Sequence, residues 1–341
     1  MRKITRRSFL AAAAACGAAA ALTACGGSSA STAASSTASS AAASAAAADG
    51  QTYTIGICQL VQHAALDAAT QGFQDVLTEE FGDNVTFDLQ NAQGDSATCA
   101  TITNGFVSAG VDLIMANATP ALQAAQAATD TIPILGTSVT EYGVALGLDN
   151  YDGTVGGNVS GTSDLAPLDQ QAAMILELFP DAKKIGILYC SAEPNSVYQS
   201  DVVKAELEKS GVTVSVYTFA DSNDVAAVTA TACDENDVLY IPTDNTAASC
   251  TEAINNVAEP AGVPIIAGEE GICAGCGVAT LSINYYDLGV TTGKMAAKIL
   301  TGEANISEMP IEYFPDPVKK YNPAICEALG ITVPEDYVAI G

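Results

Sequence analysis

The sequence predicts an α/β protein built from two similar lobes with parallel sheets. Short apolar runs alternate with helical patterns from residue 53 onward, which is the pattern of βαβ units joined by right-handed crossovers. This alternation occurs twice in the same order, so the chain contains two comparable units. With 341 residues, 49% of them hydrophobic, the chain is long enough for two buried cores.

The first series predicts four strands connected by helices. Its apolar runs are YTIGICQLV (53–61), VTFDLQNA (85–92), VDLIMANA (111–118) and IPILGTSV (132–139). Its helical patterns cover about 64–81, 95–109 and 119–129. Strands that are connected through helices run parallel, so these elements predict one parallel sheet.

The second series repeats this plan. Its apolar runs are KKIGILYC (183–190), VTVSVYTF (212–219), DVLYIPT (237–243) and VPIIAGE (263–269). Its helical patterns cover about 167–179, 195–210, 224–232 and 246–259. Segments 110–136 and 236–268 match in detail, since each has an Asp, an apolar strand, a polar tip with Thr, an Ala-rich helix, a Pro, a strand and a Gly. Both lobes are therefore expected to share one architecture.

The amino terminus predicts export. A positively charged start is followed by FLAAAAACGAAAAL, which is too short and too alanine-rich for a stable membrane span. The segment Leu22-Thr23-Ala24-Cys25-Gly26 resembles the lipobox of bacterial lipoproteins, so residues 1–25 are a predicted signal peptide with lipidation at Cys25. The segment TRRSFL is similar to a twin-arginine export motif, and an ordinary Sec signal is the alternative.

Two further features concern the rest of the chain outside the folded elements. Residues 26–50 are almost entirely Gly, Ser, Ala and Thr, so they predict a disordered tether rather than part of a core. No later stretch has 18 consecutive apolar residues, so no further membrane span is expected.

The charge balance excludes nucleic acids as partners. Removal of residues 1–25 takes away all the arginines and Lys3, which leaves 8 basic against 39 acidic residues. Phosphate binding needs a basic face, and this chain is strongly acidic. Any carboxylate ligand must therefore be bound without a guanidinium group.

The cysteines allow two interpretations. Eight follow Cys25, and an even number in an exported protein is compatible with disulfides, whereas apolar surroundings favour buried free thiols. The pair Cys273 and Cys276 lies between glycines and runs into the strand-like VATLSI, unlike a redox CxxC at the start of a helix. A local disulfide or two inert thiols is favoured over catalysis, and no metal site or cofactor is expected.

Polar tips follow the apolar runs of both series. In open α/β sheets, ligands bind outside the carboxyl ends of the strands, so two lobes that face each other across such ends predict a binding cleft. The ligand-binding candidates are Gln59, His63, Asn91, Thr119, Ser138, Thr140, Asp164, Asn195, Asp244, Asn245, Glu269 and Asn284.

Several motifs within 51–341 carry a family resemblance. They are His63 with Leu66-Asp67, Asn91-Ala92-Gln93-Gly94-Asp95, Ala118-Thr119-Pro120-Ala121, Gly157-Asn158-Val159-Ser160-Gly161-Thr162-Ser163-Asp164, Pro242-Thr243-Asp244-Asn245-Thr246 and Tyr286-Asp287-Leu288-Gly289. The chain resembles ABC-transporter substrate-binding lipoproteins of the tryptophan and aromatic-amino-acid group, which have the type I periplasmic-binding-protein fold. Relatives tend to have Pro where this chain has Ala64.

The resemblance implies interleaved lobes and a transport function. Lobe 1 would comprise 51–160 plus 284–304, and lobe 2 would comprise 161–283 plus 305–341. The implied protein is not an enzyme. It is lipid-anchored at the outer face of the cell membrane, captures a small ligand by hinge closure, and delivers it to an ABC permease. A sensing module for a signalling receptor, or a sugar or nucleoside ligand, is the alternative.

An amino-acid ligand would divide the candidates by charge. Thr119, Ser138 and Thr140, together with helix N-termini, suit a carboxylate. Asp164, Asp244 or Glu269 would meet the ammonium group, and the asparagines could hydrogen-bond either group. For each candidate, a helix cap or turn is the alternative function, and His63 is equally compatible with a polar loop residue.

Overall fold

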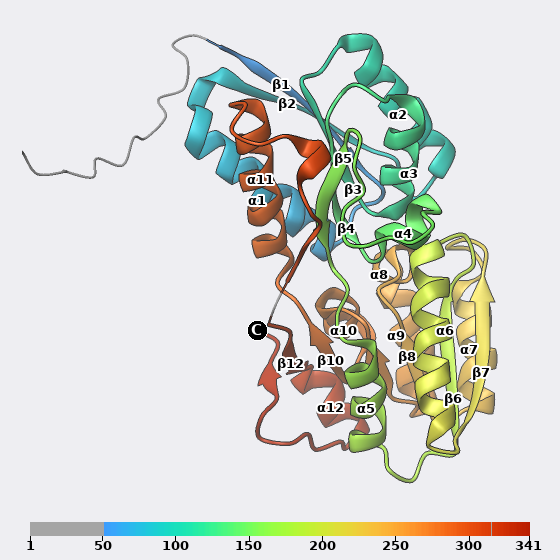
Figure 1. The fold of residues 1–341 in the computed structure, drawn as a ribbon. Coiled ribbons are helices and arrows are strands. Elements are labelled where there is room, and N and C mark those ends of the chain that lie inside the picture. The colour runs from blue at the N-terminus through green and yellow to red at the C-terminus, as the bar shows by residue number, and fades with distance from the viewer. Residues whose placement is uncertain (1–50, 315) are drawn as a thin grey trace, which may run out of the picture. The chain divides into compact units, whose positions relative to one another are not determined.

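The computed structural model describes residues 51–314 and 316–341. The predicted signal peptide, the lipidation site Cys25 and the tether lie outside these residues. Two sheets organise the described chain, and each has its own buried core (Figure 1). We call the first sheet and its helices lobe 1, and the second sheet and its helices lobe 2.

Lobe 1 contains a parallel sheet of six strands in the order β11-β5-β4-β3-β1-β2. The strands are β1 Tyr53–Gln59, β2 Val85–Asn91, β3 Leu113–Asn117, β4 Ile134–Val139, β5 Val159–Ser163 and β11 Glu312–Tyr313. Helices α1 and α11 lie on one face and α2 and α3 on the other (Figure 1). The helical elements are α1 Ala64–Phe81, α2 Ser96–Ala109, α3 Thr119–Ala128, α4 Tyr142–Leu146, α11 Tyr285–Leu300 and the 3₁₀ turns η1 Gly82–Asn84 and η2 Ile306–Glu308.

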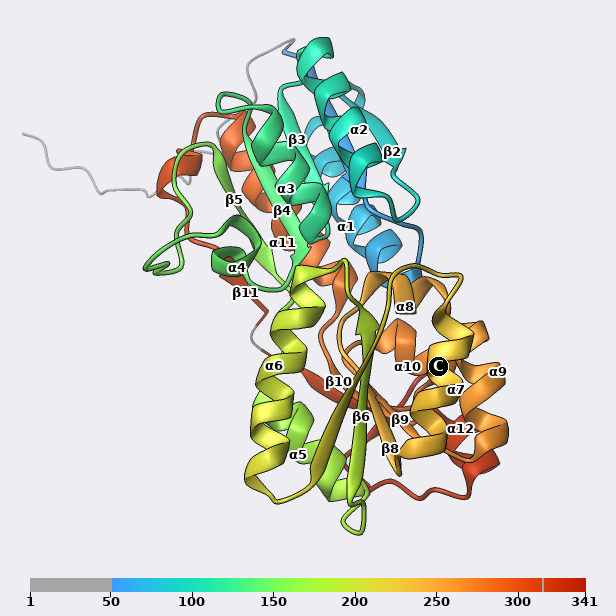
Figure 2. The same cartoon turned by 90° about the vertical axis from the view of Figure 1, so that its right-hand side faces the viewer.

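Lobe 2 contains a seven-stranded sheet in the order β13-β12-β10-β9-β8-β6-β7. The strands are β6 Lys184–Cys190, β7 Thr213–Phe219, β8 Val238–Ile241, β9 Ile265–Ala267, β10 Ala279–Ser282, β12 Val318–Tyr321 and β13 Val338–Ala339. Helices α5 and α6 lie on one face and α7 and α9 on the other (Figure 2). The helices are α5 Leu168–Leu178, α6 Pro194–Lys209, α7 Val225–Glu235, α8 Asn245–Ser249, α9 Thr251–Ala261, α10 Glu270–Cys276 and α12 Pro323–Leu329.

Packing explains why these segments form these elements. Strands β3, β4 and β8 are buried along their whole length, as expected for parallel strands covered on both faces. Helices α1 and α11 approach closely at two glycines. A Cβ atom on Gly72 would lie 2.2 Å from the Tyr286 carbonyl oxygen, and one on Gly289 would lie 2.0 Å from that of Ala69. This tight contact joins α11 to lobe 1, although its sequence follows lobe 2.

The expected sheets are present, with differences at their edges. Strand β12 pairs antiparallel with β10, so the second sheet is not purely parallel. The chain reaches β12 directly from lobe 1 without a crossover helix, so no βαβ connection fixes its direction relative to β10. The predicted helix at 246–259 is divided into α8 and α9. Within the described ranges, no helix combines the length and the apolar character needed to cross a membrane.

The lobe boundaries also differ from those expected. Strand β5, which extends to Ser163, and β11 both belong to the first sheet, so lobe 1 continues past the expected limits at 160 and 304. The chain therefore crosses between the sheets near 164–167, near 283 and between β11 and β12. The small, polar sequence of β5 pairs because β4 and β11 flank it.

Candidate functional site

The carboxyl ends of strands from both lobes face each other (Figure 2). A cavity of about 130 Å³ lies between them and is lined by both lobes. None of the twelve predicted residues is in its lining, although Leu60, Pro120 and Thr246 directly follow the predicted residues Gln59, Thr119 and Asn245.

The tips of β3 and β4 hold strained backbone. Ala118 has φ 91° and Ser138 has φ 53°, values that residues other than glycine seldom adopt. Ala118 is the N-cap of α3 and no side chain caps this helix, so its first N–H groups have no side-chain acceptor, while Pro120, its second residue, has no N–H. Strain of this kind is concentrated at ligand sites, and here it coincides with the predicted residues Thr119 and Ser138.

Asp164 follows β5 beside these tips, where its backbone N–H donates to the Val139 carbonyl oxygen at 3.2 Å. The side chain is 4% exposed, and Oδ2 accepts a hydrogen bond of 2.9 Å from the Tyr285 hydroxyl. Burial raises the pKa of Asp164 to about 6, although hydrogen bonds from Tyr285 and Thr140 oppose this shift. Among the described residues, Oδ1 has no hydrogen-bond partner.

Other predicted residues also carry buried polar atoms without a hydrogen-bond partner among the described residues. Four of the predicted residues carry a buried polar atom that no described residue pairs. These atoms are Oδ1 of Asp164, Oγ of Ser138, Nδ1 of His63 and Oδ1 of Asn195. Buried polar groups are normally hydrogen-bonded, and five described residues outside the predicted set also carry such an unpaired atom.

His63 bridges the lobes. Its Nε2 lies 3.2 Å from Oδ1 of Asn245, which belongs to lobe 2. The Asn245 amide nitrogen donates to Glu193 at 2.7 Å, so its oxygen faces the histidine and Nε2 must carry the proton. Burial lowers the pKa of His63, despite the nearby charges of Glu193 and Asp67. The histidine is thus held neutral, with Nδ1 as an acceptor.

The carboxylates of lobe 2 are paired within the protein. Asp244 accepts hydrogen bonds from the backbone N–H groups of Cys190 (2.8 Å) and Ala247 (2.7 Å), and from the Ser196 hydroxyl (2.7 Å). Burial, followed by the charge of Glu193, raises the pKa of Asp244 to about 8. These contacts make Asp244 the cap of α8, which was the alternative to ligand contact.

The remaining candidates occupy local structural positions. Glu269 caps α10 through the N–H groups of Gly271 and Ile272, and burial raises its pKa to about 7. Asn284 caps α11, and exposed Asn91 accepts from the Gln93 N–H. Gln59 donates to Asp67 and accepts from Thr70. Thr140 is buried beside Asp164.

Two residues that pair with predicted site residues were not predicted from the sequence. Glu193 is 3% exposed and accepts hydrogen bonds from the N–H groups and side chains of Asn245 and Thr246. Glu193 directly precedes α6 without capping it through its side chain, so its contacts with the start of α8 had no signal in the local sequence. Tyr285, the partner of Asp164, had no distinguishing signal in the sequence.

The cysteines are all free thiols within the part of the chain that the structure describes. Cys273 and Cys276 lie inside α10 rather than in a loop before a strand, and burial raises the pKa of both. Raised pKa values disfavour the reactive thiolate. Over the same residues, no group of His, Cys, Asp and Glu side chains is placed to hold a metal ion.

Comparison with known proteins agrees with this geometry. A family model described as ABC transporter substrate binding protein matches residues 54–340. A Clostridioides difficile protein named tyrosine-binding protein is 39% identical over 260 residues, which is 75% of each chain.

Two solved structures relate the lobes to ligand binding. A Streptococcus pneumoniae domain in complex with L-Trp is 35% identical with a TM-score of 0.79, covering 84% of this chain and 97% of that one. A ligand-free, open structure from Clostridium difficile is 39% identical but has a TM-score of only 0.64, covering 84% and 99%. The more identical chain superposes less well, as expected if the lobes described here are arranged as in the L-Trp complex.

Proposed function

Because the chain belongs to the family of ABC transporter substrate-binding proteins, we propose that it captures an aromatic amino acid between its lobes for delivery to an ABC permease. The fold is that of the type I periplasmic binding proteins. Family members and the relatives above are binding proteins, and the proposed function requires no catalytic step.

Asp164 carries the proposal of an amino-acid ligand. Its unpaired Oδ1 is a buried acceptor, and an ammonium group is the ligand group that best compensates a buried carboxylate. The Tyr285 hydroxyl fixes the carboxylate through Oδ2 and leaves Oδ1 directed elsewhere. Asp164, rather than Asp244 or Glu269, is therefore the proposed ammonium partner.

The neighbouring tips suit the ligand carboxylate. The N-terminus of α3 has no side-chain cap, and the Ser138 hydroxyl has no partner among the described residues. Helix N-termini and hydroxyl groups stabilise anions without a guanidinium. Thr119, as the first residue of α3, adds a buried hydroxyl. An acceptor and these donors on adjacent strand tips match a zwitterion better than a sugar.

The relatives support an aromatic side chain, since one is named for tyrosine and another was solved with L-Trp. The test is calorimetry with the twenty amino acids, several sugars and nucleosides. We expect aromatic amino acids to bind most tightly and Asp164→Asn to abolish most of this affinity. Asp83→Asn, an exposed site on η1, is the matched control. A sugar that binds while no amino acid does would overturn the ligand assignment.

We place the protein outside the cytoplasm, held by a lipid on Cys25. The family and the lipobox-like segment support this proposal. Cys25→Ala should release the protein from the membrane fraction without changing its ligand affinity. A variant that remains membrane-bound after normal processing would contradict the anchor.

A further inference from the structure

Two cysteines lie together in the core of lobe 1. Cys58 is in β1, directly before the last residue of that strand, and Cys99 is the fourth residue of α2. Both are free thiols in the structure, both are 0% exposed, and both belong to the same apolar cluster. Neither lines the cavity between the lobes, so the proposed function gives this pair no part.

The packing of α2 on β1 places the two residues opposite each other. A Cβ atom on Gly56 would lie 2.6 Å from the ring of Phe106, so α2 rests directly on β1 at this point. Cys58 follows Gly56 by two residues and is on the same face of the strand. Cys99 precedes Phe106 by seven residues, which is about two turns along the same face of the helix. Because α2 returns antiparallel to the strands, both steps lead from this contact towards the cleft.

The two thiol groups are hydrogen-bonded to each other. This hydrogen bond, together with burial, raises the pKa of Cys58. The same hydrogen bond lowers the pKa of Cys99, although burial opposes the shift. Cys99 also lies near the N-terminus of α2, where the helix dipole favours a thiolate. Cys99 is therefore the thiol that ionises first, and Cys58 is the neutral donor beside it.

From this geometry we propose that Cys58 and Cys99 form a disulfide bond in the exported protein. The inference rests on the proposed location outside the cytoplasm, because disulfides form and persist in oxidising compartments. Since both thiols are buried in the folded chain, the bond forms before α2 packs on β1. Once formed, it is shielded from reductants by the same packing.

The oxidant is the disulfide of an exported thiol–disulfide oxidoreductase. The Cys99 thiolate attacks one sulfur of that disulfide, the other sulfur leaves as a thiolate, and a mixed disulfide forms. Cys58 then loses its proton and attacks the sulfur of Cys99, which releases the second sulfur of the oxidoreductase. Two electrons and the two thiol protons pass to the oxidoreductase, which leaves as a dithiol.

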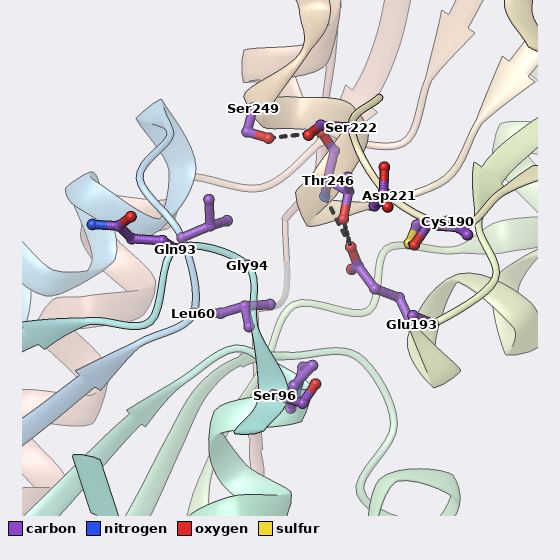
Figure 3. Close-up of a pocket in the computed structure, with 14 residues that line it drawn as sticks. Leu60, Gln93, Gly94, Ser96, Cys190, Glu193, Asp221, Ser222, Thr246 and Ser249 are labelled. Carbon is purple, nitrogen blue, oxygen red and sulfur yellow. Dashed lines mark hydrogen bonds between the residues drawn. The ribbon is translucent and has the colours of Figure 1, made fainter. Parts of the chain in front are cut away.

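The bond would hold together the part of lobe 1 that faces lobe 2. Leu60 follows β1, Gly94 precedes α2, and Ser96 begins it, and all three line the cavity between the lobes (Figure 3). The Gly94 N–H donates to the Leu60 carbonyl oxygen at 2.8 Å. A disulfide between Cys58 and Cys99 would join the same two segments covalently and close the loop between them.

Peptide mapping of the exported protein tests the pair. Free thiols are blocked with maleimide under denaturing conditions, and the protein is then digested without reduction. We expect the peptides that contain Cys58 and Cys99 to be joined, and Cys233 in lobe 2 to carry the label. Separate, labelled peptides for Cys58 and Cys99, or a bond from either to another cysteine, would overturn the inference.

The melting temperature gives a second readout. Wild-type protein that is refolded in reductant should melt about 5 °C or more below the exported form, because a disulfide restricts the unfolded chain. This difference should be absent in Cys58→Ala and should remain in Cys233→Ala, which changes a buried cysteine of lobe 2. Comparing the two forms of each protein cancels the cost of the space that alanine leaves. A difference of equal size in Cys58→Ala would contradict the proposed bond.

Failure of export has a different result. The chain would then remain in the cytoplasm with both thiols reduced, and refolding the purified protein with oxidised glutathione would test the pair by itself. Joined peptides of Cys58 and Cys99 in that preparation would support the inference, and two labelled thiols would overturn it.

Discussion

The strand tips of the two lobes have the same place in the fold but differ in how they use their polar groups. In lobe 1, the described residues include strained backbone at Ala118 and Ser138, an uncapped helix α3 and unpaired side-chain atoms. In lobe 2, Asp244, Glu193 and Glu269 accept hydrogen bonds from neighbouring N–H groups and hydroxyls. All four described non-glycine residues with positive φ lie in lobe 1.

This difference indicates a division of labour between the lobes. Strained backbone is concentrated at the lobe 1 tips, so we expect lobe 1 to make the main contacts with the ligand. The three carboxylates at the lobe 2 tips are already paired within the protein, although Oδ1 of Asn195 in lobe 2 is also unpaired among the described residues. Substitutions at lobe 1 tips should therefore change affinity, whereas those at lobe 2 caps should change stability.

The largest expected effect on affinity is that of Asp164→Asn. The substitution removes the charge that faces the ammonium but keeps a side chain of the same size. Hydrogen bonds to charged groups contribute about 1.5–3 kcal/mol, so affinity should fall about 10- to 150-fold. Calorimetry at pH 7.5 measures this, with the melting temperature of the ligand-free protein as the control for folding. Unchanged affinity would show that recognition is not concentrated at Asp164.

The same carboxyl group predicts a pH dependence of binding. The pKa of Asp164 is raised to about 6 by burial, so the group gains a proton as the pH falls through 6. Protonated Asp164 cannot neutralise an ammonium, and affinity should decrease between pH 7 and pH 5. In Asp164→Asn this decrease should be much smaller, because only the contribution of His63 remains. A decrease of equal size in the variant would assign it to another group.

Asp244→Asn should have its main effect on stability. Asn still accepts from the Ala247 N–H, but its amide would face the Cys190 N–H, and an unsatisfied buried donor costs about 1–3 kcal/mol. The raised pKa of Asp244 also predicts how the stability of the protein changes with pH. Its stabilising contribution is full below its unfolded pKa and is lost as the pH rises through about 8. The destabilisation caused by Asp244→Asn should therefore be smaller at pH 9 than at pH 6.

Denaturant unfolding of both proteins at the two pH values measures this difference, and calorimetry shows whether binding changes as well. A variant with normal stability and much weaker binding would contradict the assignment of Asp244 as a cap. It would also remove the distinction between the lobes, because a lobe 2 carboxylate would then recognise the ligand.

These two aspartates show what the sequence could and could not predict. Both follow apolar segments at the cleft, and local sequence gives the same two alternatives for each. Asp244 is satisfied by Cys190 and Ser196, which are 54 and 48 residues away, so only tertiary packing decides its role. The alternation of strands and helices was sufficient to predict most elements, because that pattern is local. The polar strand β5 and the boundary at β11 depend on pairing partners distant in sequence.

Ser138→Ala should have a smaller effect on affinity. It removes one neutral donor from the proposed carboxylate site, and such hydrogen bonds contribute about 0.5–1.5 kcal/mol. Affinity should fall about two- to tenfold, while the unpaired hydroxyl predicts no loss of ligand-free stability. Ser108→Ala on the exposed face of α2 is the control. A destabilised protein with normal affinity would place the hydroxyl in the core network instead.

The smallest expected effect on affinity is that of His63, through the closure of the two lobes. In the described arrangement the half-buried His63 reaches from lobe 1 to lobe 2, Nε2 contacts Asn245, and Nδ1 has no partner among the described residues. Burial lowers the pKa of His63 below its usual 6.5, against the opposing charges of Glu193 and Asp67. Protonation therefore favours separated lobes, where water solvates the ring, and acidification should weaken ligand binding.

His63→Gln isolates this contribution, because its amide can still donate to Asn245 but does not titrate. We expect nearly equal affinities of the two proteins at pH 7.5, and a few-fold weaker binding by the wild type than by the variant near pH 5.5. Taking the ratio of the two affinities at each pH cancels the decrease caused by Asp164, which both proteins share. A ratio that stays constant from pH 7.5 to 5.5 would mean that His63 joins the lobes without responding to pH.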